Sequence, residues 1–419
     1  MAWTCYGDRL HCRGNFGRSF KIMTEPGEPN IDFLNTEIAF SHKSDRELRQ
    51  THYLFRLMNK PSLVKMGSFF GNLLANLPFH LGDQIIKETI FKQFCGGTSL
   101  LECQKVIDKL YSKKTLTILD YGVEAKETEE DFKRTLDENL NAIEFAYSSS
   151  NVPVISTKLT GYIPFSVLEK IHAGAELDNY SKVCFERLEE RFELLCEKAY
   201  ELGVSIFVDA EESWIQNPID QLVMRCMVKY NKEKPILYNT YQMYRKGRLD
   251  AMKEDFESAK KQNFIFGAKI VRGAYMEKER QRAAQLQIED PIQVNKEATD
   301  NQYNDAIRFC VQFPEQISLV NSSHNWESNA LQVELMKQNN IPVDHPHMNF
   351  CQLYGMSDNL TFNLAAHDYI VAKYVPYGPI KDVIPYLIRR AQENSSVTGD
   401  MSRELKLLDS EMKRRGLIK

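Results

Sequence analysis

The spacing of hydrophobic positions along the chain changes near residue 115. Between residues 30 and 110, apolar residues recur at helical spacing, which predicts amphipathic helices over segments such as 45–58, 63–76 and 100–110. Beyond residue 115, short apolar runs rich in β-branched and aromatic residues appear, and we expect each to form a buried β-strand. The eight runs are 115–121, 152–160, 204–211, 235–242, 264–272, 316–323, 347–354 and 369–374.

Helical segments separate these runs. Examples are 127–147, 180–202, 222–229, 248–262 and 326–338. Buried strands that alternate with helices predict a parallel sheet covered by helices, and eight such units over about 260 residues match a (β/α)8 TIM-type barrel. The predicted fold class is therefore α/β, a barrel preceded by an N-terminal helical region. The alternative is an open doubly wound sheet, which the absence of a GxGxxG motif after any strand disfavours.

Four parts are expected along the chain. Residues 1–29 form a disordered leader, 30–110 the helical region, 111–396 the barrel with its binding site, and 397–419 a C-terminal helical tail. The first 23 residues are basic and nearly free of acidic side chains. That composition is typical of a weak targeting peptide and equally of an unstructured leader.

Composition narrows the class of protein. The chain has 419 residues, 43% of them hydrophobic, and a net charge of −4, so a large core fits and nucleic acid is not an expected partner. The nine cysteines form no CxxC motif, which favours a reducing, intracellular compartment and no zinc site. The amphipathic segment 54–79 is a candidate for peripheral membrane contact, although core packing explains it as well.

Polar side chains close nearly every predicted strand. In a (β/α)8 barrel these strand ends meet at the C-terminal mouth, where active sites are built. Burying such charges together costs free energy unless they pair or meet a ligand, so an active site and a structural ion-pair network are both open. The residues are Lys158, Thr160, Asp209, Glu211, Gln242, Lys269, Arg272, Tyr275, His324, Asn325, Gln352, Tyr354, Tyr374 and Tyr377.

The segment 374–394 carries the most specific pattern. Its strand is expected to break at Pro376 and Gly378, and a helix to begin near Asp382 as N-cap, with Pro385 in the first turn. Two adjacent guanidiniums on one helix face are suited to gripping a carboxylate or phosphate, while a solvated Arg–Glu surface pair is the alternative. The residues on that face are Tyr386, Arg389, Arg390 and Glu393.

Six motifs together resemble the proline dehydrogenase family, flavin-dependent enzymes that oxidise proline to pyrroline-5-carboxylate. The resemblance covers residues 115–396 in order and the preceding helices more loosely, and the paired-arginine helix is its specific part. The motifs are TKLTG at 157–161, VDAE at 208–211, KIVRGAY at 269–275, SHN at 323–325, CQLYGM at 351–356 and YVPYG…YLIRRAQEN within 374–394.

The resemblance implies a distorted barrel with the last helix lying over a proline site. It implies that Arg389 and Arg390 clamp the proline carboxylate and that Glu393 orients the two arginines. Lys158 and Asp209 are expected to form polar walls, with Asp209 tied to an arginine. The residues expected to pack against the proline ring are Tyr275, Leu353, Tyr374 and Tyr386.

The same resemblance implies non-covalently bound FAD at the barrel mouth. Many members of the family carry Arg and then Lys where this chain has Lys269 and then Arg272, which leaves open which of the two reaches flavin N5. Lys296 and Thr299 are expected to serve the nucleotide tail. The other expected flavin contacts are Gln242, Ala274, Ser323, His324 and Asn325.

The implied chemistry is hydride transfer to flavin N5, followed by electron transfer to a membrane quinone. The implied location is the bacterial cytoplasm or inner-membrane periphery, or alternatively the mitochondrion. In the resembling family, enzymes that prefer hydroxyproline carry a smaller residue at the position of Tyr374.

Other functions are compatible with some of the residues. Lys158 or Lys269 could be the Schiff-base lysine of an aldolase, because that chemistry uses a desolvated lysine in a barrel mouth. His345 and His347 form an HxH pair but precede their strand, so we expect loop residues and no metal site. A barrel that only binds a ligand is the non-enzymatic alternative.

Overall fold

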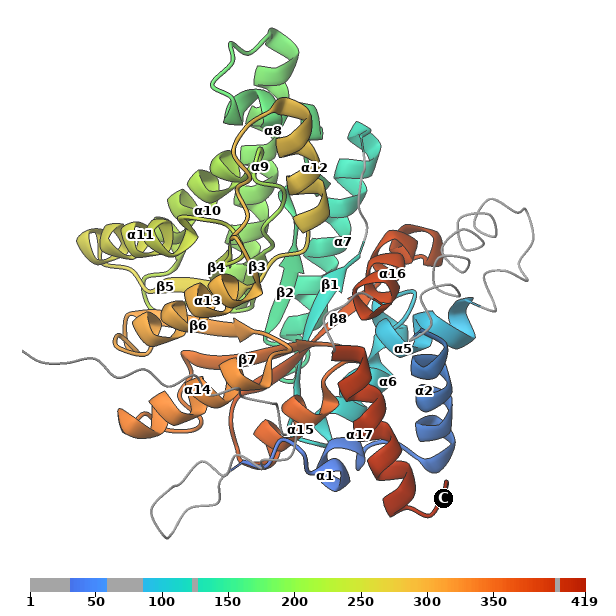
Figure 1. The fold of residues 1–419 in the computed structure, drawn as a ribbon. Helices are drawn as coiled ribbons and strands as arrows, with labels where there is room; N and C mark the ends of the chain where they lie inside the picture. Colours follow the sequence, from blue (N-terminus) through green and yellow to red (C-terminus); the bar gives the residue numbers. More distant parts are fainter. Residues whose placement is uncertain (1–30, 59–85, 123–126, 396–399) are drawn as a thin grey trace, which may run out of the picture.

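The computed structural model describes residues 31–58, 86–122, 127–395 and 400–419, except for the side chains of 391–395 and 400–402. Eight parallel strands close into a barrel in sequence order (Figure 1). This confirms the predicted barrel and rules out the open sheet. The strands are β1 (Leu116–Tyr121), β2 (Val154–Thr157), β3 (Ser205–Val208), β4 (Leu237–Gln242), β5 (Phe266–Val271), β6 (Ile317–Ser322), β7 (Met348–Leu353) and β8 (Val371–Tyr377).

The barrel closes where β1 pairs with β8. Their parallel register runs from Leu116 opposite Ala372 to Tyr121 opposite Tyr377. The expected break at Pro376 is therefore wrong, since β8 continues through it to Tyr377. Proline lacks only the N–H group, and the Pro376 carbonyl still accepts a hydrogen bond from the Gly96 amide at 2.8 Å.

Helices surround the strands (Figure 1). Two of the predicted helices, residues 248–262 and 326–338, match the structure to the residue as α11 and α14. The helices of the barrel are α7 (Glu129–Tyr147), α8 (Phe165–His172), α9 (Asn179–Leu202), α10 (Gln216–Tyr230), α11 (Arg248–Gln262), α12 (Met276–Leu286), α13 (Lys296–Cys310), α14 (Trp326–Gln338) and α15 (Asp358–Ala366).

The described helices before the barrel pack with those after it. They are α1 (Thr36–Phe40), α2 (Asp45–Met58), the π-helical turn Lys87–Phe91, α5 (Lys92–Phe94), α6 (Leu100–Tyr111), α16 (Ile380–Ser395) and α17 (Asp400–Arg414). In Figure 1, α17 lies beside α1 and α2. The predicted helix 45–58 is confirmed as α2, whereas the predicted helix 63–76 and the leader lie outside the described residues.

A separate hydrophobic core joins the described helices before the barrel to those after it. It includes Phe40 of α1, Phe55 of α2, Phe94 of α5, Leu387 of α16 and Leu408 of α17. Burying large side chains of this kind stabilises a protein by roughly 1.5–3 kcal/mol each. The core therefore fixes α16 and α17 against the side of the barrel.

Helix α16 begins earlier than the sequence predicts. Asp382 lies in its first turn rather than at the N-cap, and Pro385 lies inside the helix. The reason is that the Pro379 carbonyl accepts hydrogen bonds from the amides of Asp382 (2.9 Å) and Val383 (3.2 Å), so the helical ladder starts before Asp382.

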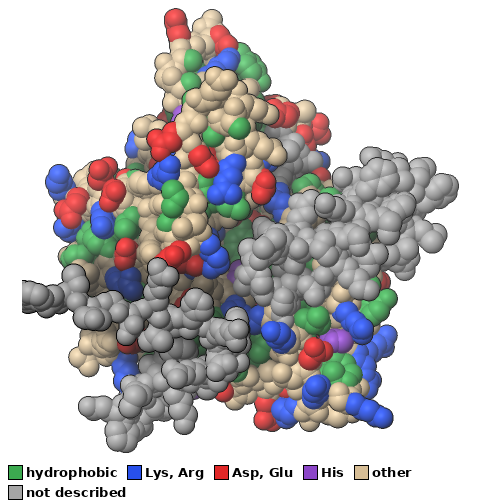
Figure 2. Space-filling view, viewed as in Figure 1, with side chains coloured by type: hydrophobic (Ala, Val, Ile, Leu, Met, Phe, Trp, Pro, Cys, Tyr) green, Lys and Arg blue, Asp and Glu red, His purple; other side chains and the backbone are tan. Residues whose placement is uncertain are grey.

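Acidic and basic side chains are interleaved on the face drawn in Figure 2. Within the described residues, no helix is both long and apolar enough to pass through a bilayer.

Candidate active site

Four strands bring polar side chains together around Asp209, the residue that follows β3. Its Oδ1 lies 2.5 Å from Lys269 Nζ on β5 and 3.0 Å from Ser156 Oγ on β2. Its Oδ2 accepts a hydrogen bond from the Tyr374 hydroxyl on β8 at 2.8 Å. We call Asp209, Lys269, Ser156 and Tyr374 the mouth cluster.

The mouth cluster keeps Asp209 ionised. Burial alone would raise the pKa of Asp209, but the Lys269 and Lys158 ammonium groups outweigh it, and the net pKa is lowered. The expected arginine partner is therefore wrong, because the ion pair is made with Lys269. Alternate residues of a strand face opposite sides, so Lys269 points into the barrel while Arg272 points outward.

A cavity of 510 Å³ opens beside this cluster. Three of the predicted substrate residues line it, namely Lys158, Tyr275 and Arg389. Glu211, which was noted only as a polar strand end, lines it too and is 4% exposed. Glu211 accepts hydrogen bonds from the Thr160 amide (3.1 Å) and hydroxyl (2.5 Å), and burial raises its pKa to about 7.

Helix α16 and the end of β7 supply the remaining predicted substrate residues. Arg390 and Tyr386 are both buried, and the Arg390 guanidinium carbon lies 5.3 Å from the centre of the Tyr386 ring. Leu353 packs against both Tyr374 and the core that contains Tyr386. The side chain of Glu393 lies outside the described residues.

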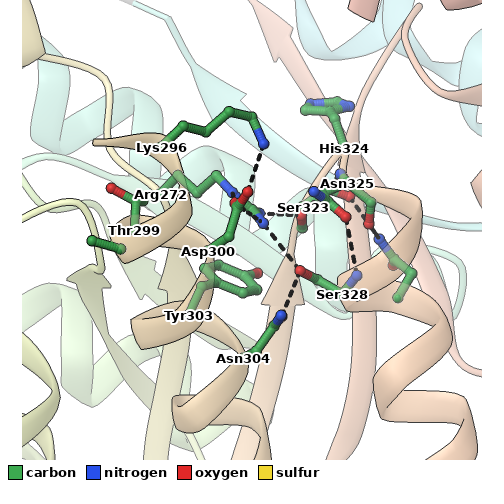
Figure 3. A network of polar contacts seen from close by, with 12 residues as sticks. Arg272, Lys296, Thr299, Asp300, Tyr303, Asn304, Ser323, His324, Asn325 and Ser328 are labelled. Atoms are coloured by element: carbon green, nitrogen blue, oxygen red, sulfur yellow. Dashed lines mark hydrogen bonds and ion pairs between the residues drawn. The ribbon is translucent and has the colours of Figure 1, made fainter. Parts of the chain in front are cut away.

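Six of the nine predicted cofactor residues form a second group, beside β5 and β6 (Figure 3), namely Arg272, Lys296, Thr299, Ser323, His324 and Asn325. The Arg272 guanidinium contacts Asp300 Oδ1 (2.7 Å), Ser323 Oγ (2.7 Å) and Ser328 Oγ (3.0 Å). Lys296 lies 2.6 Å from Asp300 Oδ2. Burial would raise the pKa of Asp300, but Lys296 and Arg272 outweigh it and the net pKa is lowered.

His324 and Asn325 follow β6 at the mouth. Asn325 caps α14 by accepting a hydrogen bond from the Ser328 amide at 3.1 Å, and its own amide donates to Ser323 Oγ at 3.0 Å. Burial, reinforced by cations that include Lys373, lowers the pKa of His324 to about 3. His324 is therefore a neutral imidazole at physiological pH.

Two further predicted cofactor contacts are Gln242, the last residue of β4, and Ala274, which follows β5. The Gln242 side chain accepts a hydrogen bond from the Ala274 amide at 3.4 Å and donates one to the Glu211 carbonyl at 2.7 Å. This links the two groups of residues. The Thr299 hydroxyl donates to the Asn295 carbonyl at 3.3 Å, in the first turn of α13.

The second group could hold an anionic dinucleotide. Helices α13 and α14 begin there with asparagine N-caps, Asn295 and Asn325. Helix N-termini favour anions through their unsatisfied N–H groups. Lys296 adds a largely exposed ammonium and Arg272 a guanidinium, so the donor set fits a diphosphate.

The HxH pair has ordinary partners. His345 Nε2 lies 3.2 Å from Glu315, and His347 Nδ1 lies 2.8 Å from the Pro314 carbonyl. Among the described residues, no cluster of three or more His, Cys, Asp or Glu side chains could hold a metal ion.

Several site residues were not predicted. Glu211 could have been found as the second acid of VDAE, and Asp300 as the acid four residues after Lys296. Trp214, in a loop, and Phe165, the first residue of α8, also line the cavity, with ring centres 6.5 Å apart, but single aromatic residues at such positions give no distinct signal.

A closed parallel barrel with charged side chains gathered at the C-terminal mouth defines a (β/α)8-barrel enzyme. The family model for proline dehydrogenase matches residues 103–403. The chain belongs to the proline dehydrogenase family, which confirms the predicted family and enzyme class.

Two relatives agree with this assignment, and one solved structure shares the fold. Proline dehydrogenase 1, mitochondrial, of Dictyostelium discoideum is 35% identical over 91% of this chain and 75% of that protein. Hydroxyproline dehydrogenase of Xenopus laevis is 30% identical over 90% of this chain and 89% of that protein. Proline utilization A of Bdellovibrio bacteriovorus matches in fold with a TM-score of 0.68 at 20% identity, over 88% of this chain and 40% of that one.

Proposed function

We propose that this chain oxidises L-proline to 1-pyrroline-5-carboxylate by hydride transfer to N5 of a bound FAD and passes the electrons to a quinone, as the first step of proline catabolism. The observation that carries the proposal is the cavity lined by Lys158, Tyr275 and Arg389 beside the Asp209–Lys269 pair, whose side chains are 16% and 5% exposed. Membership of the proline dehydrogenase family supports the same reaction.

The substrate is held by charge at one end and by apolar surface at the other. Arg389 and Arg390 grip the proline carboxylate, and Glu393 orients them. Lys158 and Asp209 form the polar walls. Fixing both ends of a small ring gives the near-attack geometry that oxidation requires. The ring packs against Tyr275, Leu353, Tyr374 and Tyr386.

The cofactor is held by the donors beside β5 and β6. A bound flavin supplies the hydride acceptor. Arg272, Lys296 and the N-termini of α13 and α14 suit its diphosphate, and Lys269 lies on the substrate side, 5.0 Å from the Tyr374 ring. The remaining contacts are Gln242, Ala274, Thr299, Ser323, His324 and Asn325.

The proline amine must be neutral when it reacts, so the rate rises with pH through the amine's own ionisation. We assign no general base. Glu211 lines the cavity together with Glu127 and Glu212, and burial raises its pKa to about 7, so its own negative charge is lost at lower pH.

The relatives support the proposed location, and the proposed acceptor rests on the family resemblance. The Dictyostelium relative is named as mitochondrial, which supports a mitochondrial location over the bacterial alternative. A quinone acceptor requires peripheral contact with a membrane. Hydroxyproline is the second candidate substrate, because the Xenopus relative is named for it.

The visible spectrum of the purified full chain tests the proposal. The protein should be yellow, L-proline should bleach the flavin band under anaerobic conditions, and a quinone should restore it. Acid precipitation should release all the colour, because the flavin is not covalently attached. A colourless protein whose Lys158 or Lys269 is trapped by borohydride with a carbonyl substrate would instead support an aldolase.

A further inference from the structure

Ser357 adopts an unusual conformation at the barrel mouth. It precedes α15 with a left-handed backbone, φ 51° and ψ 41°, and its side chain makes no capping hydrogen bond to the helix. Serine in that position normally caps its own helix. Here the hydroxyl lies 2.9 Å from Nδ1 of His324 instead.

Contacts from other parts of the chain hold Ser357 in this conformation. Its backbone amide donates to Oε1 of Glu404, on α17, at 2.6 Å. The next residue, Asp358, is fixed by Lys373 Nζ at 3.0 Å, and Lys373 is 0% exposed. Arg403, beside Glu404 on α17, donates to the His324 carbonyl at 3.0 Å. Helix α17 thus holds both Ser357 and His324.

The position of the proton on His324 follows from the surroundings of Ser357. Ser357 is 4% exposed, and among the described residues its hydroxyl has one hydrogen-bond partner, Nδ1 of His324. A buried hydroxyl needs an acceptor for its proton, so Ser357 donates to Nδ1. A neutral imidazole carries a single N–H, which leaves that proton on Nε2.

We propose that Ser357, held by Glu404, is a positioning residue that keeps the proton of His324 on Nε2, so that the ring serves as a hydrogen-bond donor to the flavin. Figure 3 shows the His324 ring directed away from the Arg272–Asp300 contacts. The identity of the group that receives this hydrogen bond rests on the proposed function. The tautomer itself does not.

The tautomer can be measured on the full chain by NMR with ¹⁵N-labelled histidine, with and without flavin. A His324→Gln variant assigns the signal. The wild-type protein should show a protonated Nε2 and an unprotonated Nδ1. Ser357→Ala should lose this single tautomer, Ser357→Thr should keep it, and Ser410→Ala, an exposed hydroxyl on α17, should leave it unchanged.

Flavin affinity gives an independent readout. Losing one oriented hydrogen bond should weaken flavin binding roughly 2- to 10-fold in Ser357→Ala. Glu404→Gln retains an oxygen acceptor for the Ser357 amide and should resemble the wild type. Glu404→Leu should resemble Ser357→Ala, and if it does not fold, the Ser357 variants decide.

Two results would overturn the inference. One is a wild-type His324 with its proton on Nδ1, and the other is an unchanged tautomer in Ser357→Ala. A protein that binds no flavin at all would instead overturn the proposed function, while the flavin-free NMR spectrum would still report whether Ser357 sets the tautomer.

Discussion

At the scale of single residues, the mouth cluster contains paired charges, and the cavity beside it provides the space for a substrate. Lys269 neutralises Asp209 inside the barrel, and the Tyr374 hydroxyl is tied to the same carboxylate. Arg389 of α16 lines the cavity, and Arg390 is buried next to it on the same helix. The first prediction tests the proposed grip of these two arginines on the substrate carboxylate.

Arg389→Met and Arg390→Met should each raise the KM for proline strongly while the flavin stays bound. Removing one member of a charge-assisted pair in a dry site costs about 2–5 kcal/mol. Arg389→Lys keeps the positive charge but loses the bidentate guanidinium, so its KM should lie between those of the wild type and Arg389→Met. Arg308→Met, an exposed arginine on α13, is the control. Steady-state kinetics decide, and a near-normal KM in both methionine variants would remove the clamp.

Tyr374 should favour proline over trans-4-hydroxyproline. Its hydroxyl is held by Asp209 (2.8 Å) and Ser156 (3.1 Å), so the ring cannot move aside easily. Overpacking costs about 1–3 kcal/mol, or roughly a tenfold to hundredfold preference in kcat/KM. Tyr374→Ser should narrow this gap mainly by losing proline efficiency, and Tyr374→Phe, which keeps the ring but loses both hydrogen bonds, should narrow it less. Equal use of both substrates by the wild type would contradict this assignment.

Glu211 should make the protein less stable as pH rises. Its folded pKa of about 7 exceeds the ordinary value of 4.5, so the folded state binds the proton more tightly and stability falls between those values. Glu211→Gln should thus gain about 2–3 kcal/mol relative to the wild type between about pH 5 and about pH 8. Chemical unfolding at both pH values measures this, and an equal difference at both would contradict the raised pKa.

At the scale of elements, turns at the mouth require glycine where two segments meet closely. Gly355 follows β7 with φ +80°, and its carbonyl accepts a hydrogen bond from Gln93 of α5 at 2.7 Å. A Cβ atom at this position would lie 2.0 Å from the Gln93 carbonyl oxygen. The turn therefore joins the helices before the barrel to its mouth.

Gly355→Ala should destabilise the protein more than Gly174→Ala. Both glycines have positive φ, but a Cβ at Gly174 would meet no atom within 4 Å. Left-handed strain alone costs about 1–2 kcal/mol, and the clash at Gly355 should add about 1–3 kcal/mol. The free energy of unfolding of the two variants tests this, and equal losses would show that the turn relaxes without cost.

Elements formed by local sequence were predictable, whereas others were not. The strands were found because each is a short apolar run between helices, and α11 and α14 were found to the residue. Helix α12 (Met276–Leu286) has few apolar residues, so its periodicity is weak. The start of α16 depends on the Pro379 carbonyl, which propensity at Asp382 does not reveal.

Site residues were likewise predictable where a local motif marks them and not where contacts between distant segments decide their role. The motifs point to Lys158, Tyr275 and Arg389, and the structure brings these three to one cavity. The prediction of an arginine partner for Asp209 was wrong, because the orientation of β5 and not the residue type brings Lys269 to Asp209. The Ser357–Glu404 contact spans 47 residues, so no local pattern could indicate it.

At the scale of the whole molecule, a buried carboxylate joins the segment after α1 to the barrel. Asp358 of α15 lies 3.0 Å from Lys373 on β8, and 3.4 and 3.6 Å from His42 and Lys43 after α1. Burial would raise the pKa of Asp358, but Lys373 and Lys43 outweigh it and the net pKa is far below the usual range. Immediately after α17, Arg415 donates hydrogen bonds to the Phe40 and Lys43 carbonyls, both at 2.9 Å.

Lys373→Met should therefore destabilise the whole protein by about 3–5 kcal/mol, because it leaves a buried carboxylate without its nearest cation. The double variant Lys373→Met/Asp358→Asn should lose less than the sum of the single variants, since no unpaired charge remains. Lys87→Met, which breaks the exposed Lys87–Glu102 pair (3.1 Å), should cost less than about 1 kcal/mol. Chemical unfolding of the wild type, Lys373→Met, Asp358→Asn and the double variant gives the coupling energy between the two side chains. Additive losses would mean that Asp358 is held by His42 and Lys43 alone, and that the segment after α1 is not joined to the barrel through Lys373.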